Sequence, residues 1–112
     1  MNARTLDPLL GTPARLAIVA TLADGSDRTF SELKSATGLA DGNLHVQTGR
    51  LTAAGYLRLR REKRGGRTVT CYRLEDEGLA ALRRLSDRLL QAISGVRPVR
   101  MERGERDQSR VW

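Results

Sequence analysis

The stretch that decides the fold runs from Phe30 to Gly55 and reads FSELKSATGLADGNLHVQTGRLTAAG. Its leucines have the spacing of two short helices that cross and share one core, and Gly38 supplies a left-handed residue for the sharp turn between them. Ser31 and Asp41 are the expected N-caps of these helices, and Gly55 is the expected end of the second. The leucines assigned to the shared core are Leu33, Leu39, Leu44 and Leu51. The pattern therefore predicts a helix-turn-helix.

The second of these helices presents residues that have little need of burial. At 100° per residue, placing Leu44, Thr48 and Leu51 inward leaves small and hydrogen-bonding side chains outward. Such a face can enter a major groove, where Asn and Gln can read adenine, Arg can read guanine and Val can touch a thymine methyl. The candidate base contacts are Asn43, His45, Val46, Gln47 and Arg50. The alternative is an ordinary exposed face, which accounts less well for Gly42 and for Gly49, since a glycine in mid-helix costs about 1 kcal/mol relative to alanine.

A hairpin pattern follows the second helix. The segment from Tyr56 to Glu62 alternates leucine with arginine, which predicts a strand with one buried and one solvated face. Gly65 and Gly66 form a favoured two-residue turn, and the segment from Thr68 to Leu74 is rich in β-branched and aromatic residues. The leucines that the first strand is expected to bury are Leu57 and Leu59.

The hairpin concentrates positive charge. The cations between Arg58 and Arg73 are opposed there by a single acid, Glu62. Phosphates are the natural counter-surface, because each neutralised phosphate releases counterions and makes binding salt-dependent. The candidate phosphate contacts are Arg58, Arg60, Arg61, Lys63, Arg64 and Arg67. The alternative is a solvated edge hairpin whose charges discourage sheet aggregation. The glycine turn favours the first interpretation, because it lets the cations project at a tip.

A helix is also predicted before this central unit. Asp7 opens a short turn that Gly11 interrupts, and Thr12 caps a helix from Pro13 to Ala23. Residues 26–28 are expected to form a loop. The residues assigned to the core face of this helix are Leu16, Val19, Ala20 and Ala23.

The last predicted helix begins with the acidic residues 75–77, ends near Ser94 and carries more leucine than one face of a small domain needs. The surplus predicts a seam for a second copy of the chain, with two leucines near the N-terminus as additions. The candidate dimer-interface residues are Leu9, Leu10, Leu82, Leu85, Leu89 and Ile93. The alternative is that all of them cover the chain's own core.

Length and composition set the outer bounds. The 112 residues have room for one domain, assigned to residues 1–95, and for a charged tail at residues 96–112 that is expected to be disordered. The net charge of +7 favours a polyanionic partner. No stretch is apolar enough to span a membrane, and the single cysteine, Cys71, allows no intramolecular disulfide, so the expected location is the cytoplasm.

Catalytic and metal chemistry find little support in the sequence. No paired carboxylates share a face, and neither a nucleophile–base set nor a phosphate-loop spacing occurs. His45 and Cys71 are the only imidazole and thiol, which falls short of any zinc pattern. Cys71 is expected to be a small packing residue or a quiet surface thiol rather than an oxidation sensor, because the chain offers no resolving cysteine. The sequence therefore predicts no enzyme, no metal site and no cofactor.

Three segments, taken in order, carry a family resemblance. They are PARLAIVATLADG, TFSELKSATGLADGNLHVQTGRLTAAGYL and RREKRGGRTVTCYRLEDEGLAAL. From about residue 9 to residue 90, the chain resembles the small stand-alone winged helix-turn-helix regulators related to MarR and ArsR. The resemblance implies a homodimeric transcriptional regulator, usually a repressor, with Gly42 to Arg50 in the recognition helix and the basic hairpin as its wing. The chain departs from the family pattern at Thr48, usually a leucine, and at Gly49, usually charged or polar.

Together these observations predict an α+β winged helix with a three-helix core, a two-stranded β wing and a C-terminal dimerisation helix. The predicted function is sequence-specific binding of double-stranded DNA by a homodimeric transcriptional regulator. Two alternatives remain, a winged-helix module that docks a protein and an RNA-binding accessory factor. The concentrated cations disfavour the first, and the absence of an aromatic stacking platform disfavours the second. The sequence identifies no small-molecule effector.

Overall fold

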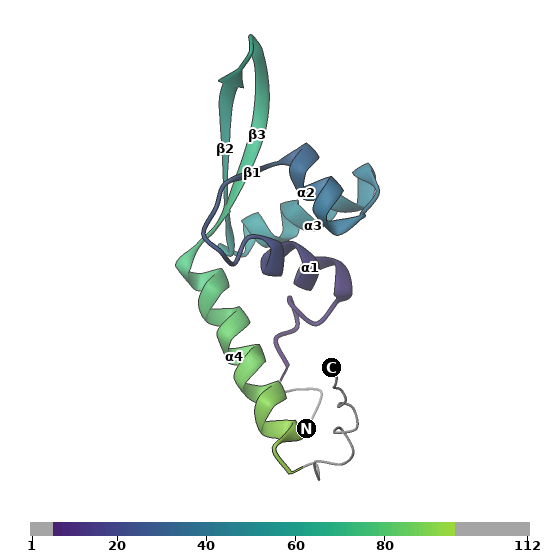
Figure 1. Cartoon of the computed structure of the whole chain (residues 1–112), viewed down its shortest axis with the longest axis vertical. Coiled ribbons are helices and arrows are strands. Elements are labelled where there is room, and N and C mark those ends of the chain that lie inside the picture. Colours follow the sequence, from purple (N-terminus) through teal and green to yellow (C-terminus); the bar gives the residue numbers. More distant parts are fainter. Residues whose placement is uncertain (1–5, 96–112) are drawn as a thin grey trace, which may run out of the picture.

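A computed structural model of the chain describes residues 6–95, which form an α+β arrangement with a projecting hairpin (Figure 1). In chain order the elements are α1 (Pro13–Thr21), β1 (Arg28–Thr29), α2 (Phe30–Thr37), α3 (Asp41–Ala53), β2 (Leu57–Arg64), β3 (Arg67–Leu74) and α4 (Asp76–Ile93). The sheet has the order β1-β3-β2, so β3 is its central strand. Residues 26–28 are predicted as a loop, but Arg28 belongs to β1; a two-residue strand has no periodicity of its own that a sequence could reveal.

The helix-turn-helix is confirmed as α2 and α3, but its caps differ from the prediction. Thr29, not Ser31, caps α2, and it forms a reciprocal capping box with Glu32 (N–H to Oγ1 3.1 Å, N–H to Oε1 2.8 Å). The α3 N-cap position is Ala40, so Asp41 is already helical, and its carboxylate forms an ion pair with Lys34 at 2.8 Å. The turn between the helices is at Gly38, whose φ of 72° is the left-handed conformation.

Helix α1 lies at the centre of the core. It contacts α2, α3 and α4, so its buried arc is wider than that of a surface helix. Ile18, Val19 and the following Leu22 are fully buried, whereas Ala20 is exposed, which corrects the predicted core face. Thr12 occupies the N-cap position, but its hydroxyl makes no capping hydrogen bond.

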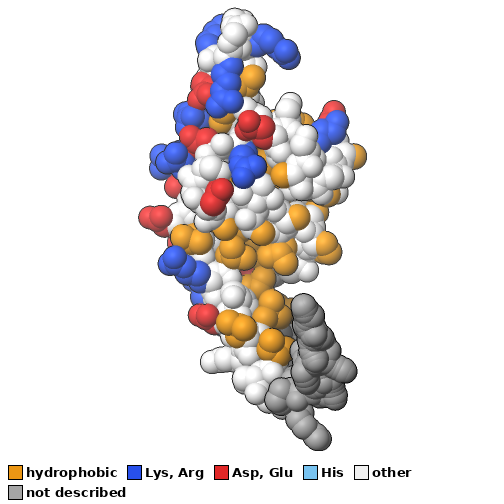
Figure 2. Space-filling model, viewed as in Figure 1, with side chains coloured by type: hydrophobic (Ala, Val, Ile, Leu, Met, Phe, Trp, Pro, Cys, Tyr) orange, Lys and Arg blue, Asp and Glu red, His pale blue; other side chains and the backbone are white. Residues whose placement is uncertain are grey.

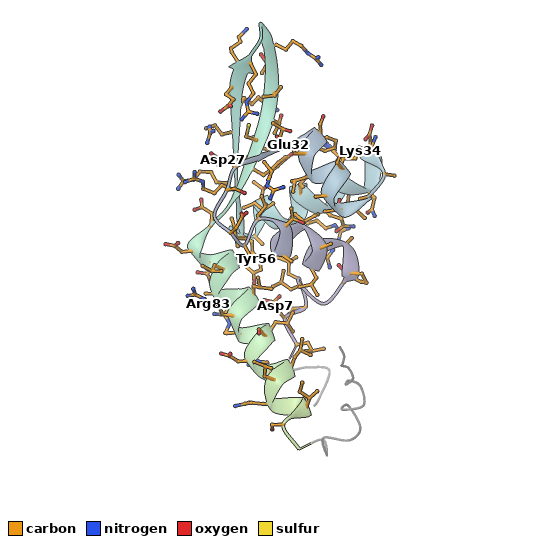
Figure 3. All side chains as sticks on the ribbon, in the orientation of Figure 1. Asp7, Asp27, Glu32, Lys34, Tyr56 and Arg83 are labelled. Atoms are coloured by element: carbon orange, nitrogen blue, oxygen red, sulfur yellow. The ribbon has the colours of Figure 1, made fainter. Side chains whose placement is uncertain are left out.

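The residues before α1 are fastened to the rest of the domain by Asp7. One carboxylate oxygen accepts hydrogen bonds from the backbone N–H groups of Leu9 and Leu10 at 2.8 and 3.2 Å, as the predicted cap requires. The other accepts from the hydroxyl of Tyr56 at 2.7 Å, just beyond the end of α3 (Figure 3). Burial, with the hydrogen bond to Asp7, raises the pKa of Tyr56 to about 12.

Strands β2 and β3 pair along their whole length and turn at Gly65 and Gly66, whose φ values of 58° and 79° fit the glycine turn predicted there. Leu57 is buried as expected, but Leu59 is exposed, contrary to the prediction. The reason is geometric: Leu59 lies on the edge strand β2, whereas its directly opposed partner Tyr72 on the central strand β3 is buried in the core cluster.

Helix α4 runs away from the hairpin toward the opposite end of the molecule (Figure 1). Two of the predicted dimer residues are in the chain's own core, since Leu10 is 0% and Leu85 is 6% exposed; the prediction is therefore corrected there. Leu89 and Ile93, with Leu90 beside them, are exposed. Between residues 6 and 95, no helix combines the length and the apolarity needed to cross a membrane. The predicted tail at 96–112 lies outside the described residues.

Candidate nucleic-acid interface

Helix α3 presents the predicted polar face to solvent. Leu44, Thr48 and Leu51 are buried, as expected, and the Thr48 hydroxyl donates to the Leu44 carbonyl at 2.9 Å. This bond within the helix explains how a threonine takes a core position. The exposed residues of the face include Gly42, Asn43, His45, Val46, Gly49 and Arg50. A Cβ built at either glycine would meet no atom within 4 Å, so nothing in the chain's own packing requires a glycine there.

Gln47 differs from the other candidate base contacts because the protein already holds its amide. It is partly buried, and its Oε1 accepts a hydrogen bond from Nη1 of Arg15 at 2.7 Å. Its Nε2 donates to Oδ1 of Asn43 at 3.0 Å. The link between the two amides has no signal in the sequence, and Arg15, a buried cation on α1, is not among the predicted site residues.

The cations of the hairpin divide between its two faces. Directly opposed residues of an antiparallel pair share a face, and successive residues alternate between faces. The register pairs Arg58 with Arg73 and Arg60 with Cys71, so these side chains share one side with Glu62 and Arg64. We call this side the paired face, defined by Arg58, Arg60, Glu62, Arg64, Cys71 and Arg73.

Carboxylates neutralise much of the paired face. Asp27, just before β1 (Figure 3), contacts Arg73 at 2.9 Å and Arg60 at 3.3 Å. Glu62 bonds Arg60 at 2.6 Å and Arg64 at 2.7 Å. Glu75 also contacts Arg58 at 3.0 Å, so the expectation that Glu62 alone opposes these cations is corrected.

The ion pairs lower the pKa values of the Asp27 and Glu62 carboxylates. The hydrogen bond from Arg73 holds the pKa of Asp27 below its usual range, and those from Arg60 and Arg64 do the same for the pKa of Glu62. Burial raises the pKa of the Cys71 thiol, and the Glu62 carboxylate adds to that shift.

Three hairpin cations make no ion pair within the described residues 6–95: Arg61, Lys63 and Arg67, which we call the unpaired cations. Arg61 and Lys63 lie opposite Thr70 and Thr68, on the face away from the acids. The base of that same face carries Leu57 and Tyr72, which join the core cluster that contains Leu44 and Leu51 of α3. Arg67 stands at the tip beside the glycine turn, where the register places it opposite Arg64 and therefore on the side of the paired face. Two of the unpaired cations, Arg61 and Lys63, thus occupy the hairpin face that packs on α3, and the third lies at the tip.

Charged and apolar surfaces lie at opposite ends of the molecule. Figure 2 shows lysine and arginine gathered over the hairpin and hydrophobic side chains gathered along α4 and at its junction with the body. An apolar groove of about 240 Å³ is lined by Leu16, Leu82, Leu85, Ser86, Leu89, Leu90 and Ile93.

Among residues 6–95 there is no cluster of three side chains suited to hold a metal ion. Cys71 is 1% exposed and packs in the sheet, as expected of a small packing residue.

The helix-turn-helix, the antiparallel hairpin after it and the cationic tip define a winged-helix protein. The chain belongs to the winged helix DNA-binding domain family, whose model matches residues 14–93. The predicted resemblance to MarR-like winged-helix transcriptional regulators is thereby confirmed.

Solved structures agree with this assignment. The chain is similar to a transcriptional regulator homologue from Pyrococcus horikoshii OT3, with 26% identity over 80% of this chain and 89% of that chain (TM-score 0.73). It is 30% identical to Rv0081 of M. tuberculosis over 76% of this chain and 81% of that one (TM-score 0.61). It is 25% identical to the PcaV transcriptional regulator of Streptomyces coelicolor over 79% of this chain and 61% of that one (TM-score 0.67). No curated protein matches the chain significantly.

Proposed function

We propose that the chain is a homodimeric transcriptional repressor that binds double-stranded DNA sequence-specifically, with α3 in the major groove and the hairpin wing on phosphates or in the minor groove. The functional unit is the single domain at residues 1–95, acting in the cytoplasm without catalysis and without a cofactor. Repression is the proposed outcome because occupancy of a promoter requires nothing beyond tight binding to DNA.

One observation carries the proposal: the exposed face of α3 and two of the unpaired cations, Arg61 and Lys63, belong to the same side of the domain. Arg61 and Lys63 share their hairpin face with the residues that pack on α3. A duplex that received α3 in its major groove would place phosphates within reach of that face. Gly42 and Gly49 support a close approach, because no atom of the chain occupies the space that their side chains would fill.

The homodimer is supported by the apolar groove on α4. Its exposed rim of Leu89, Leu90 and Ile93 would be covered by the same helix of a second copy, as a two-fold interface requires. Helix α4, which carries most of the groove residues, runs toward the end opposite the wing (Figure 1), so pairing there would leave both proposed DNA-contacting surfaces free. Leu82 and Leu9, which are partly buried, would extend this interface.

Selection of bound duplexes from a random pool tests the proposal. The full chain should enrich a palindromic sequence with half-sites one duplex turn apart, about 34 Å. The double variant Asn43→Ala/Arg50→Ala should lose the sequence preference while it retains binding to random duplex through the wing.

Each departure from this result has a definite meaning. Enrichment of a single isolated half-site would contradict the dimer. Preferential competition by RNA would favour the accessory-factor alternative. Failure to retain any duplex at low salt would refute DNA binding and favour a module that docks a protein.

A further inference from the structure

A chain of three hydrogen-bonded side chains runs from the interior of the domain to the exposed face of α3. Arg15 of α1 is only 9% exposed, and its Nη1 donates to Oε1 of Gln47 at 2.7 Å. Nε2 of Gln47 then donates to Oδ1 of Asn43 at 3.0 Å, one helical turn earlier. Every hydrogen bond in this chain therefore has its donor on the buried side and its acceptor on the outer side.

Arg15 sets this direction because a guanidinium has only donors. The Gln47 amide can face it only with its carbonyl oxygen, which turns the Gln47 NH₂ group toward Asn43. Asn43 must in turn offer its own carbonyl oxygen, since two NH₂ groups cannot bond each other. A second bond anchors the guanidinium, because Nε of Arg15 donates to the carbonyl of Leu9.

The consequence is an imbalance between the hydrogen-bond donors and acceptors that remain. One N–H of Gln47 and both N–H groups of Asn43 are uncommitted among these three side chains, whereas each carbonyl oxygen has one of its two lone pairs already occupied. Reading adenine requires an amide that both accepts from N6 and donates to N7. Guanine presents two acceptors in the major groove, N7 and O6, and so needs donors alone.

We infer that Arg15 is a positioning residue that orients Asn43 and Gln47 as a pair of hydrogen-bond donors, so that this part of α3 prefers guanine to adenine. The inference rests on the proposed function, because it takes α3 to lie in the major groove. It replaces the sequence-based expectation that these two amides read adenine. Arg15 itself is buried and acts only through Gln47.

The test compares two arginine-to-methionine variants in the full chain. Arg15→Met removes the donor, and Arg83→Met removes an arginine of the same size and charge from the exposed side of α4 (Figure 3). Duplex selection should show guanine at the bases that Asn43 and Gln47 face, with about a tenfold loss of affinity on replacement by adenine. In Arg15→Met the ratio of the affinities for the guanine and the adenine duplex should approach one, while the affinity for random duplex stays within about twofold of the wild-type value.

Three results would overturn the inference. One is adenine at these bases in the wild-type pool. A second is an unchanged guanine preference in Arg15→Met. A third is an equal loss of affinity for all duplexes in Arg15→Met, which would indicate a merely structural role. Arg83→Met should behave as wild type throughout.

A second variant covers the case in which Arg15→Met does not fold. Gln47→Glu keeps an acceptor for Arg15 but has no donor for Asn43, so Asn43 is released and its base preference should shift toward adenine. A preference that stays on guanine in Gln47→Glu contradicts the inference.

Side-chain amide NMR of the free protein examines the hydrogen-bond chain without DNA. The Gln47 NH₂ protons should exchange more slowly in the wild type than in Arg15→Met, and equal rates would overturn the inference. Slow exchange together with no enriched duplex would instead refute the proposed function. Enriched duplexes that carry adenine at these bases would overturn this inference and leave the proposed function standing.

Discussion

The two faces of the wing differ in how many of their cations are available. On the paired face, Arg58, Arg60, Arg64 and Arg73 bond to Asp27, Glu62 and Glu75. The unpaired cations have no such partners in the described chain. A cation that already bonds a carboxylate must exchange that partner before it can neutralise a phosphate. The difference teaches that the sign and number of charges on a hairpin overstate its capacity to hold DNA.

The largest expected effect comes from removing the unpaired cations. The triple variant Arg61→Ala/Lys63→Ala/Arg67→Ala should weaken binding to all duplexes and reduce the salt slope by about 2.7, because each phosphate contact contributes about 0.9. At 0.1 M salt this corresponds to a loss of up to about 500-fold. Fluorescence anisotropy over a salt series measures both quantities.

A triple variant on the paired face provides the matched control. Arg58→Ala/Arg60→Ala/Arg73→Ala changes the net charge by the same amount, so long-range attraction falls equally in both proteins. Its salt slope should fall by less than about one unit, because these arginines neutralise carboxylates rather than phosphates. Equal salt slopes in the two variants would contradict the distinction between the faces and would mean that total charge alone determines binding to the duplex.

A smaller effect is expected from freeing the paired face. Asp27→Asn removes the carboxylate shared by Arg60 and Arg73, which makes Arg73 available to phosphate, whereas Arg60 keeps its ion pair with Glu62. Affinity for random duplex should rise by about five- to tenfold and the salt slope should steepen by about one unit, by the same counterion argument. Unchanged or weaker binding would show that Arg73 points away from the duplex even when it is released.

The parts of the fold that follow from local chemistry could be predicted from the sequence. Gly38 and the glycine turn at 65–66 demanded left-handed backbone, and the leucine spacing fixed which side of α3 is buried. Thr48 was placed inward by angle alone, and the structure confirms it. Such features depend on residues within one or two helical turns, so a single sequence contains them.

Features that depend on distant residues could not be predicted in this way. Asp27 lies more than thirty residues before its partners Arg60 and Arg73, and no local pattern pairs them. Arg15 and Gln47 meet only because α1 crosses α3. Leu59 follows a correct strand pattern, but its exposure follows from its place on the edge strand β2, beside a buried Tyr72 on the central strand. The fold could therefore largely be predicted from the sequence, whereas the separation of paired from unpaired cations on the wing could be seen only in the three-dimensional structure.

The ion pairs of the paired face predict a modest loss of stability in acid. The pKa values of Asp27 and Glu62 are lower in the folded chain than in the unfolded one, where they are ordinary. Their contribution to stability is therefore complete above about pH 5 and is lost as the pH falls below about 4 through the lowered values. The thermal midpoint should decline in that window, and the decline should be shallower in Asp27→Asn/Glu62→Gln.

Asp87→Asn on α4 is the matched control for this pH series, since Asp87 forms no ion pair among residues 6–95. Its midpoint should follow the wild-type curve. An identical decline in the wild type and in Asp27→Asn/Glu62→Gln would mean that these ion pairs contribute nothing to folding, which is the usual result for exposed pairs that are poorly held.

The smallest expected effect concerns Cys71, which shares the paired face with Arg60 and Glu62. Burial, together with the Glu62 carboxylate, raises the pKa of the thiol, so little thiolate forms near neutral pH and reaction with a disulfide reagent should be slow. Glu62→Gln removes the nearby negative charge and releases Arg64, so the rate should rise a few-fold. Glu75→Gln, which releases only Arg58, should leave the rate unchanged. If both variants left it unchanged, the ion pairs would not shield the thiol, and burial between the strands alone would account for its low reactivity.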